Sequence, residues 1–67
     1  MEISARNQLK GKVTHVTLGA VMSEVVVDIG GQEVVSMISK ASVERLGHKP
    51  VESVVAIIKA TEVIIGK

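Results

Sequence analysis

Residues 20–47 read AVMSEVVVDIGGQEVVSMISKASVERLG, and this stretch decides the fold. Apolar residues alternate with others over residues 20–29, and the pair Gly30 and Gly31 between two β-rich runs is typical of a tight hairpin. The pattern predicts a strand over residues 20–29 and an antiparallel strand over residues 33–39. We expect the strand over residues 20–29 to have one core face and one opposite face. The core face carries Val21, Val25, Val27 and Ile29, and the opposite face carries Ala20, Met22, Glu24, Val26 and Asp28.

A short helix is expected directly after the hairpin, over residues 40–46. Ser39 occupies the N-cap position, where a side-chain oxygen accepts a backbone N–H of the first turn. Gly47 occupies the left-handed position that commonly ends a helix. The helix therefore has one or two turns.

Further β-rich runs lie on both sides of this stretch. Residues 9–18, 51–60 and 63–65 predict a first, a fourth and a fifth strand, with residues 48–50 as the connection to the fourth. Five short antiparallel strands with one short helix between the third and fourth are the element order of an OB-like barrel. The fold class is therefore all-β, in a single domain over residues 1–67.

The fourth strand is apolar without alternation over residues 54–58, so it needs cover on both faces. A 67-residue chain buries only about 60% of its unfolded surface and is marginal as a monomer. It has no cysteine and only two histidines, His15 and His48, so neither disulfides nor a zinc site supplement the core. We therefore expect a homo-oligomer, in which a neighbouring subunit covers the second face.

The composition bears on where the protein is located in the cell and on which kinds of partner it binds. No basic segment leads into an apolar run at the N-terminus, and no apolar run approaches the roughly 20 residues that span a bilayer. We expect a soluble cytoplasmic protein without a membrane partner. The formal net charge is +1 with interspersed signs, so no broad basic face indicates a polyanionic partner.

A cluster of donors lies near the N-terminus. Ser4 offers a hydroxyl, Ala5 an unobstructed backbone N–H, and Arg6 a guanidinium that stays charged at biological pH. Such a cluster can hold an anion. An exposed N-terminal segment with a solvated arginine would have the same sequence, so the cluster gains weight only together with Ser39, Ser42 and Lys59.

Four segments together resemble the molbindins, the small molybdenum-pterin-binding or Mop proteins. They are ISARNQLKG over residues 3–11, DIGG over 28–31, ISKASVERLG over 38–47 and IKATEV over 58–63. The resemblance implies a cytoplasmic hexamer of OB-like domains, arranged as a trimer of dimers. It also implies reversible binding of molybdate or tungstate at subunit interfaces, for intracellular molybdenum storage or homeostasis.

The resemblance also implies an oxyanion site that is shared between two subunits. One subunit would supply Ser4, the Ala5 backbone N–H and Arg6. The facing subunit would supply Ser39, Ser42, Lys59 and the Ala60 backbone N–H, with Thr61 in a direct or supporting role. No side chain would coordinate the metal itself, because the ligand is the oxyanion.

The chemistry of these groups suits a dianion. One arginine and one lysine offset two negative charges, and burying an unpaired dianion would be prohibitive. All of the proposed groups can donate and none is a carboxylate, so a fully deprotonated oxyanion fits, whereas the proton of hydrogen phosphate would lack an acceptor. We expect little discrimination between molybdate and tungstate.

Other interpretations of the same residues remain open. Ser39 can serve only as a helix cap, and Lys59 can be a solvated charge at a strand end, which would leave a structural oligomerisation module without a specific ligand. An OB-type nucleic-acid binder is disfavoured, because the chain has no Phe, Tyr or Trp on which bases could stack. An enzyme is not expected, since no pair of carboxylates and no Ser-His pair has a persuasive spacing.

Overall fold

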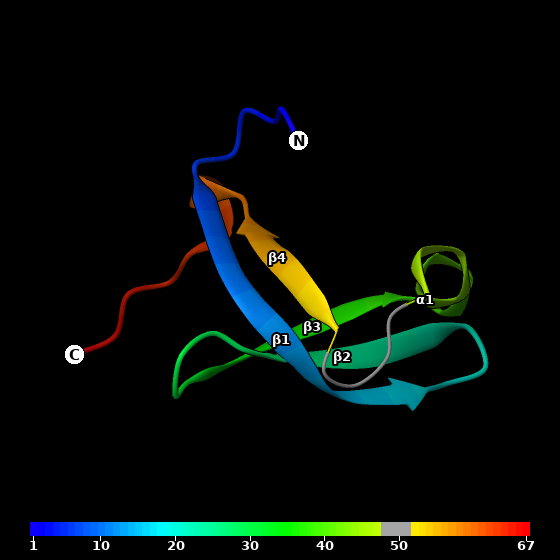
Figure 1. Cartoon of the computed structure of the whole chain (residues 1–67). Coiled ribbons are helices and arrows are strands. Elements are labelled where there is room, and N and C mark those ends of the chain that lie inside the picture. The colour runs from blue at the N-terminus through cyan, green and yellow to red at the C-terminus, as the bar shows by residue number, and fades with distance from the viewer. Residues whose placement is uncertain (48–51) are drawn as a thin grey trace.

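The computed structural model describes residues 1–47 and 52–67, and these form one curled antiparallel sheet with a short helix at one end (Figure 1). The strand order is β3-β2-β1-β4. The elements in chain order are β1 (Asn7–Leu18), β2 (Met22–Asp28), β3 (Glu33–Ser39), α1 (Lys40–Leu46), β4 (Ser53–Ile58) and the 3₁₀ helix η1 (Ala60–Glu62). The all-β class and the OB-like order with one helix are confirmed, with four strands among the described residues instead of five.

The β2–β3 hairpin is closed by the two glycines, as predicted. Gly30 and Gly31 have φ angles of 108° and 94°, a conformation that L side chains rarely adopt. Both of their N–H groups donate to Oδ1 of Asp28 at 2.9 Å. These two hydrogen bonds hold the pKa of Asp28 below its ordinary value of 3.8, because they favour the ionised carboxylate.

This lowered pKa predicts a pH-dependent stability. The ionised Asp28 stabilises the folded chain above pH 3.8, and this contribution is lost as the pH falls through the lowered pKa of the folded state. We expect Asp28→Asn to lower the urea midpoint of unfolding at neutral pH and to approach the wild-type midpoint in acid. Glu33→Gln, in the same hairpin, controls for the loss of one negative charge. A constant difference between wild type and Asp28→Asn at all pH values would contradict this account.

The helix α1 begins and ends where the sequence predicts. The Ser42 N–H donates to Oγ of Ser39 at 3.0 Å. At the other end Gly47 has a φ of 69°, and its N–H donates to the carbonyl oxygen of Val43 at 2.8 Å. The side chain of Val43 is buried and belongs to the hydrophobic core, so it packs the helix against the sheet.

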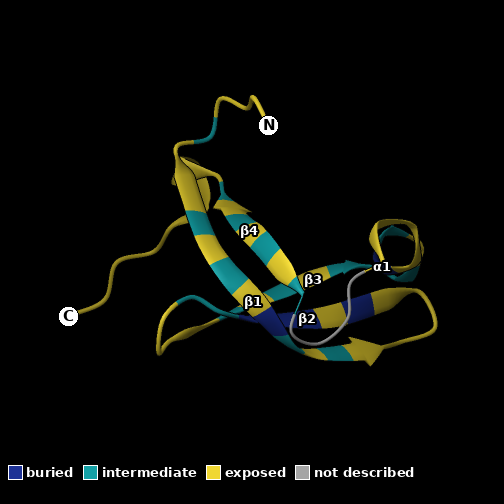
Figure 2. Cartoon of the chain, in the orientation of Figure 1, coloured by how far each residue is buried: buried dark blue, intermediate teal, exposed yellow. Residues whose placement is uncertain are grey.

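The core is a small cluster of valines, namely Val13, Val25, Val27 and Val43 (Figure 2). Val25 and Val27 confirm the predicted core face. Val21 was expected there but is 72% exposed, because β2 begins only at Met22 and Val21 lies in the preceding turn. Val26, expected on the opposite face, is buried as well. It lies on an interior strand between His15 of β1 and Val35 of β3, whose side chains flank it.

The fourth strand is shorter than predicted. It spans Ser53–Ile58 instead of residues 51–60, since Lys59 and the residues after it turn into η1. The predicted connection at residues 48–50 and the first predicted strand residue, Val51, lie outside the described residues. Burial alternates along β4, so that one face is half-buried and the other is exposed to solvent. The inner side of the sheet thus covers only one of the two apolar faces of β4, and the other face stays in contact with solvent.

The predicted fifth strand over residues 63–65 is wrong for the single chain. After η1 these residues continue as an extended segment that leaves the sheet, shown in red in Figure 1. A strand forms only where a neighbouring strand satisfies its backbone groups, and residues 63–65 have no such neighbour among the described residues. β3 and β4 are therefore the two open edges of the sheet. None of the helices in the described part is long and apolar enough to cross a membrane.

Candidate functional site

The predicted anion cluster lies at the end of the sheet where β1 begins and β4 ends. Asn7 pairs with Ile58, and Arg6 and Lys59 are the residues directly before and after that pair. Both side chains are exposed. The antiparallel register therefore brings two cations that are distant in sequence to the same end of the sheet.

Backbone donors accompany the two cations. Gln8 donates from Nε2 to the Ala5 carbonyl oxygen at 2.7 Å, which fixes the chain just before β1. On the other side, the Glu62 N–H donates to the Lys59 carbonyl oxygen at 2.9 Å and forms the single turn of η1. Ala5, Ala60 and Thr61 lie outside the ladders, and within residues 1–47 and 52–67 their N–H groups donate to no acceptor. We call Ser4, Ala5, Arg6, Lys59, Ala60 and Thr61 the cationic end.

Neither cation of the cationic end forms an ion pair with a carboxylate of the described residues. In the described part of the chain, the one ion pair joins Lys40 Nζ and Glu44 Oε1 at 3.9 Å on α1. Arg6 and Lys59 take no part in it. Two positive charges therefore face solvent together with N–H and hydroxyl donors, which is an arrangement that attracts an anion.

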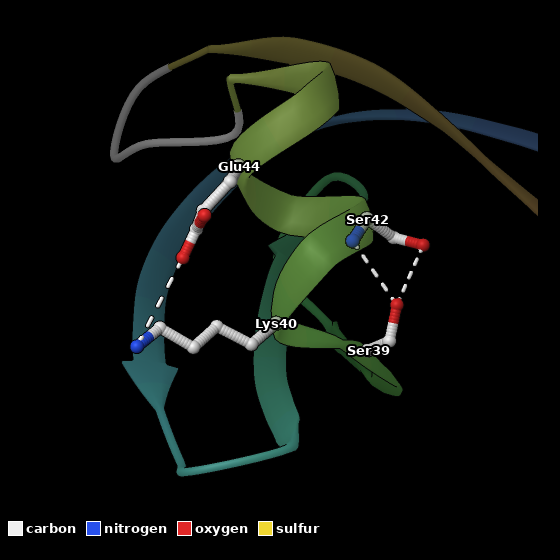
Figure 3. Close-up of polar contacts among 4 residues, drawn as sticks. All are labelled: Ser39, Lys40, Ser42 and Glu44. Atoms are coloured by element: carbon white, nitrogen blue, oxygen red, sulfur yellow. Dashed lines mark hydrogen bonds and ion pairs between the residues drawn. The ribbon is translucent and has the colours of Figure 1, made fainter.

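Ser39 and Ser42 form a second polar group at the start of α1 (Figure 3). Oγ of Ser39 accepts the Ser42 N–H at 3.0 Å and donates its own proton to Oγ of Ser42 at 2.8 Å. A hydroxyl that accepts in this way keeps its own proton for donation to another acceptor. Figure 3 shows Lys40 and Glu44 on a different side of the helix from the two serines.

The two polar groups lie at opposite ends of β1. Ser39 pairs with Met22, next to the pairing of Ser23 with Leu18 at the end of β1, whereas Arg6 precedes its first residue. The sequence analysis expects Lys59 and Ala60 on the subunit that faces Arg6, yet within one chain they lie beside it. Within one chain, Arg6 and Ser39 therefore belong to different ends of the sheet.

Two features were not anticipated from the sequence. The first is the hydrogen bond from the Gln8 side chain to the Ala5 carbonyl oxygen. The sequence signal for it was a glutamine three residues after Ala5 in a polar run. In addition, Lys10 and Lys12 flank Gly11 and, with Ser53 and Val55, line a shallow hollow of about 440 Å³ on β1 and β4. Lys10 and Lys12 are two residues apart in a strand, so their spacing alone predicts that both lie on the same face of the sheet.

Comparisons with known proteins show the family to which the chain belongs. The family model of the TOBE domain matches residues 3–65. Molybdenum-pterin-binding protein 3 of Clostridium pasteurianum is 54% identical over 66 residues, which cover 97% of both chains.

Two solved structures are similar over most of the chain. A molybdate binding protein from Sporomusa ovata superimposes with a TM-score of 0.94 at 40% identity and full coverage of both chains. The cytoplasmic molybdate-binding protein ModG, with molybdate bound, has a TM-score of 0.84 at 44% identity, covering 90% of this chain and 43% of its own. The fold of this chain therefore occurs in other proteins that bind molybdate.

Proposed function

The chain belongs to the molbindin family of TOBE-domain proteins, and from this premise we propose that it binds molybdate reversibly at an interface between subunits. The same site would take tungstate, whose tetrahedral dianion has the same charge and the same acceptor atoms. The role is intracellular storage or homeostasis of molybdenum, without catalysis. The relatives are binding proteins, and one of them, ModG, is described as cytoplasmic, which supports a cytoplasmic location here as well.

The observation that carries this proposal is the pairing of Asn7 with Ile58. It brings Arg6 and Lys59 to the same end of the sheet, and neither forms an ion pair with a carboxylate among residues 1–47 and 52–67, so two positive charges are available for one dianion. Around them, donors predominate, namely the hydroxyls of Ser4 and Thr61 and the N–H groups of Ala5 and Ala60. Donors satisfy the oxygens of a deprotonated oxyanion but not a proton that the anion itself carries.

We further propose that the site is completed by a second chain. Ser39 and Ser42 lie at the far end of β1 from the cationic end, so in our proposal they come from the facing subunit. Lys59, Ala60 and Thr61 would then act from the same chain as Ser4, Ala5 and Arg6. A hexamer built as a trimer of dimers provides repeated interfaces of this kind, in keeping with the marginal core of a single chain.

Calorimetric titration with four oxyanions tests the proposed function. We expect tight, saturable binding of molybdate and tungstate, weaker binding of sulfate because of its size, and little binding of phosphate because its proton finds no acceptor. Raising the salt concentration should weaken non-specific binding of all four anions far more than the specific binding. Equal and weak heats for all four anions would rule the proposal out and favour a structural oligomerisation module.

A further inference from the structure

Arg6 lies between two points at which the backbone is held. The residue after it, Asn7, begins β1 and pairs with Ile58, so that the start of β1 lies beside the end of β4 (Figure 1). The residue before it, Ala5, is held by its carbonyl oxygen, which accepts a hydrogen bond of 2.7 Å from Nε2 of Gln8. That length is at the short end of the range for N–H···O hydrogen bonds. The backbone of Arg6 is thus held on both sides.

The hold on the N-terminal side depends on a single side chain. In the part of the chain that the structure describes, no other hydrogen bond involves residues 1–6. Ser4 and Arg6 are exposed and Ala5 is half-buried, so packing adds little restraint. Terminal segments are poorly ordered unless specific contacts tie them down. Without the Gln8 amide, the segment that carries Arg6 would be fixed to the sheet only through its link to β1.

The geometry of the peptide bond explains how a hydrogen bond to Ala5 acts on Arg6. The Ala5 carbonyl and the Arg6 N–H belong to one planar peptide unit. A hydrogen bond to the carbonyl oxygen sets the orientation of this unit, and the pairing of Asn7 restrains the next one. The two together narrow the φ and ψ angles of Arg6 and therefore the direction in which its side chain leaves the backbone.

The chemistry of the Gln8 side chain suits a role in holding the chain. The Ala5 carbonyl is an acceptor, so it requires a donor, and the amide nitrogen of glutamine supplies one. The other end of the same amide, Oε1, is an acceptor that a deprotonated oxyanion cannot use. Gln8 therefore serves the proposed site best through Ala5 and Arg6, without touching the anion.

We propose that Gln8 is a positioning residue for oxyanion binding, which holds the Ala5–Arg6 peptide so that the guanidinium is presented at the cationic end before the anion binds. This inference rests on the proposed function. A segment that is ordered in advance loses less conformational entropy on binding, and this raises affinity. Loss of the Gln8 amide should therefore weaken binding although no group that contacts the anion is removed.

Calorimetric titration of Gln8→Met with molybdate tests this role. Methionine is of similar length, uncharged and without an N–H donor. The matched control is Gln32→Met, because Gln32 is also exposed and supports the β2–β3 turn through its backbone carbonyl, which accepts the Ile29 N–H at 2.8 Å. We expect Gln8→Met to bind molybdate about fivefold to tenfold more weakly than wild type, as for the loss of one hydrogen bond, and Gln32→Met to bind as wild type does. Equal affinities of Gln8→Met and wild type would overturn the proposal.

Double variants show whether Gln8 acts through Arg6. In an Arg6→Ala background, Gln8→Met should change the affinity by less than about twofold, because no guanidinium is left to be positioned. In a Lys59→Ala background the full loss should persist. Equal losses in the two backgrounds would mean that Gln8 acts independently of Arg6, contrary to the proposal. If wild type itself does not bind molybdate, the proposed function fails, whereas weakening by Arg6→Ala but not by Gln8→Met rejects only the role of Gln8.

Nuclear magnetic relaxation of the ligand-free protein provides a readout that does not depend on binding. Backbone N–H order parameters are about 0.85 in rigid segments and below about 0.6 in flexible ones. We expect the value at Arg6 to fall toward the flexible range in Gln8→Met and to stay at the wild-type value in Gln32→Met. An unchanged order parameter at Arg6 in Gln8→Met would show that the hydrogen bond does not hold this segment, and the proposal would be wrong.

Discussion

Arg6→Ala is expected to weaken molybdate binding by about 100-fold or more, which corresponds to about 2.7 kcal/mol. The guanidinium supplies one of the two positive charges at the cationic end, and a hydrogen bond to a charged group contributes roughly 1.5–3 kcal/mol. Its removal also leaves part of the dianion desolvated and uncompensated, which adds to the loss. Calorimetric titration of the variant with molybdate measures the effect.

The control for this prediction is Lys12→Ala. Lys12 is also an exposed cation, but it lies in the middle of β1, away from both the cationic end and α1. Both variants change the net charge equally, so a difference between them reports the position of the charge. Lys59→Ala should reduce affinity in the same direction as Arg6→Ala. If Arg6→Ala and Lys12→Ala bind molybdate alike, the assignment of Arg6 to the site is wrong.

Gly11→Ala is expected to destabilise the fold by about 2–3 kcal/mol, a large fraction of the stability of so small a domain. A Cβ at this position would overlap the backbone oxygen of Asp28 and would lie 2.8 Å from Cγ1 of Val27. The first atom belongs to the backbone of a paired strand, so it cannot move aside as a flexible side chain could. Urea unfolding at a fixed protein concentration measures the loss.

Gly66→Ala provides the control for this substitution. A Cβ at Gly66 meets nothing within 4 Å in the isolated chain, so the same chemical change should leave stability within about 0.5 kcal/mol of the wild type. The comparison separates the close approach at Gly11 from the general effect of replacing glycine by alanine. Equal unfolding midpoints for Gly11→Ala and wild type would show that β1 and β2 can separate at this point without cost.

Local signals explain which parts of the fold could be predicted from the sequence. The hairpin depends on Gly30 and Gly31, and the helix depends on Ser39 and Gly47, and all four act on residues within a few positions of themselves. Their effects do not require knowledge of the rest of the chain. The β2–β3–α1 unit was therefore predicted almost residue by residue, with β3 and α1 at their observed bounds.

The errors arise where a residue depends on distant neighbours. Alternation alone assigned Val21 to the core and Val26 to the outside, because it shows neither where β2 begins nor that β2 has neighbours on both sides. Residues 63–65 have the composition of a strand, but strand formation requires a partner, and a single sequence does not show on which chain that partner lies.

The candidate site could likewise be predicted only in part from the sequence. The residues of the cationic end were named from the sequence and from the resemblance to the molbindins. Their distribution over the fold follows from the register of Asn7 and Ile58, which no local pattern encodes. That register places Lys59 beside Arg6 and separates both from Ser39.

The long strand β1 has a further consequence, because it is shared between two neighbours. Its first half pairs with β4 and its second half with β2, and a register shift between Val13 and His15 interrupts the ladder with β2. β4 is thus secured to the sheet through one half of one strand, so it can detach in a local opening that leaves the hairpin intact. Each such opening would carry Lys59 away from Arg6. An oxyanion that bridges the two cations would oppose it, so the bound and free proteins would differ in how often the sheet opens and little in average shape.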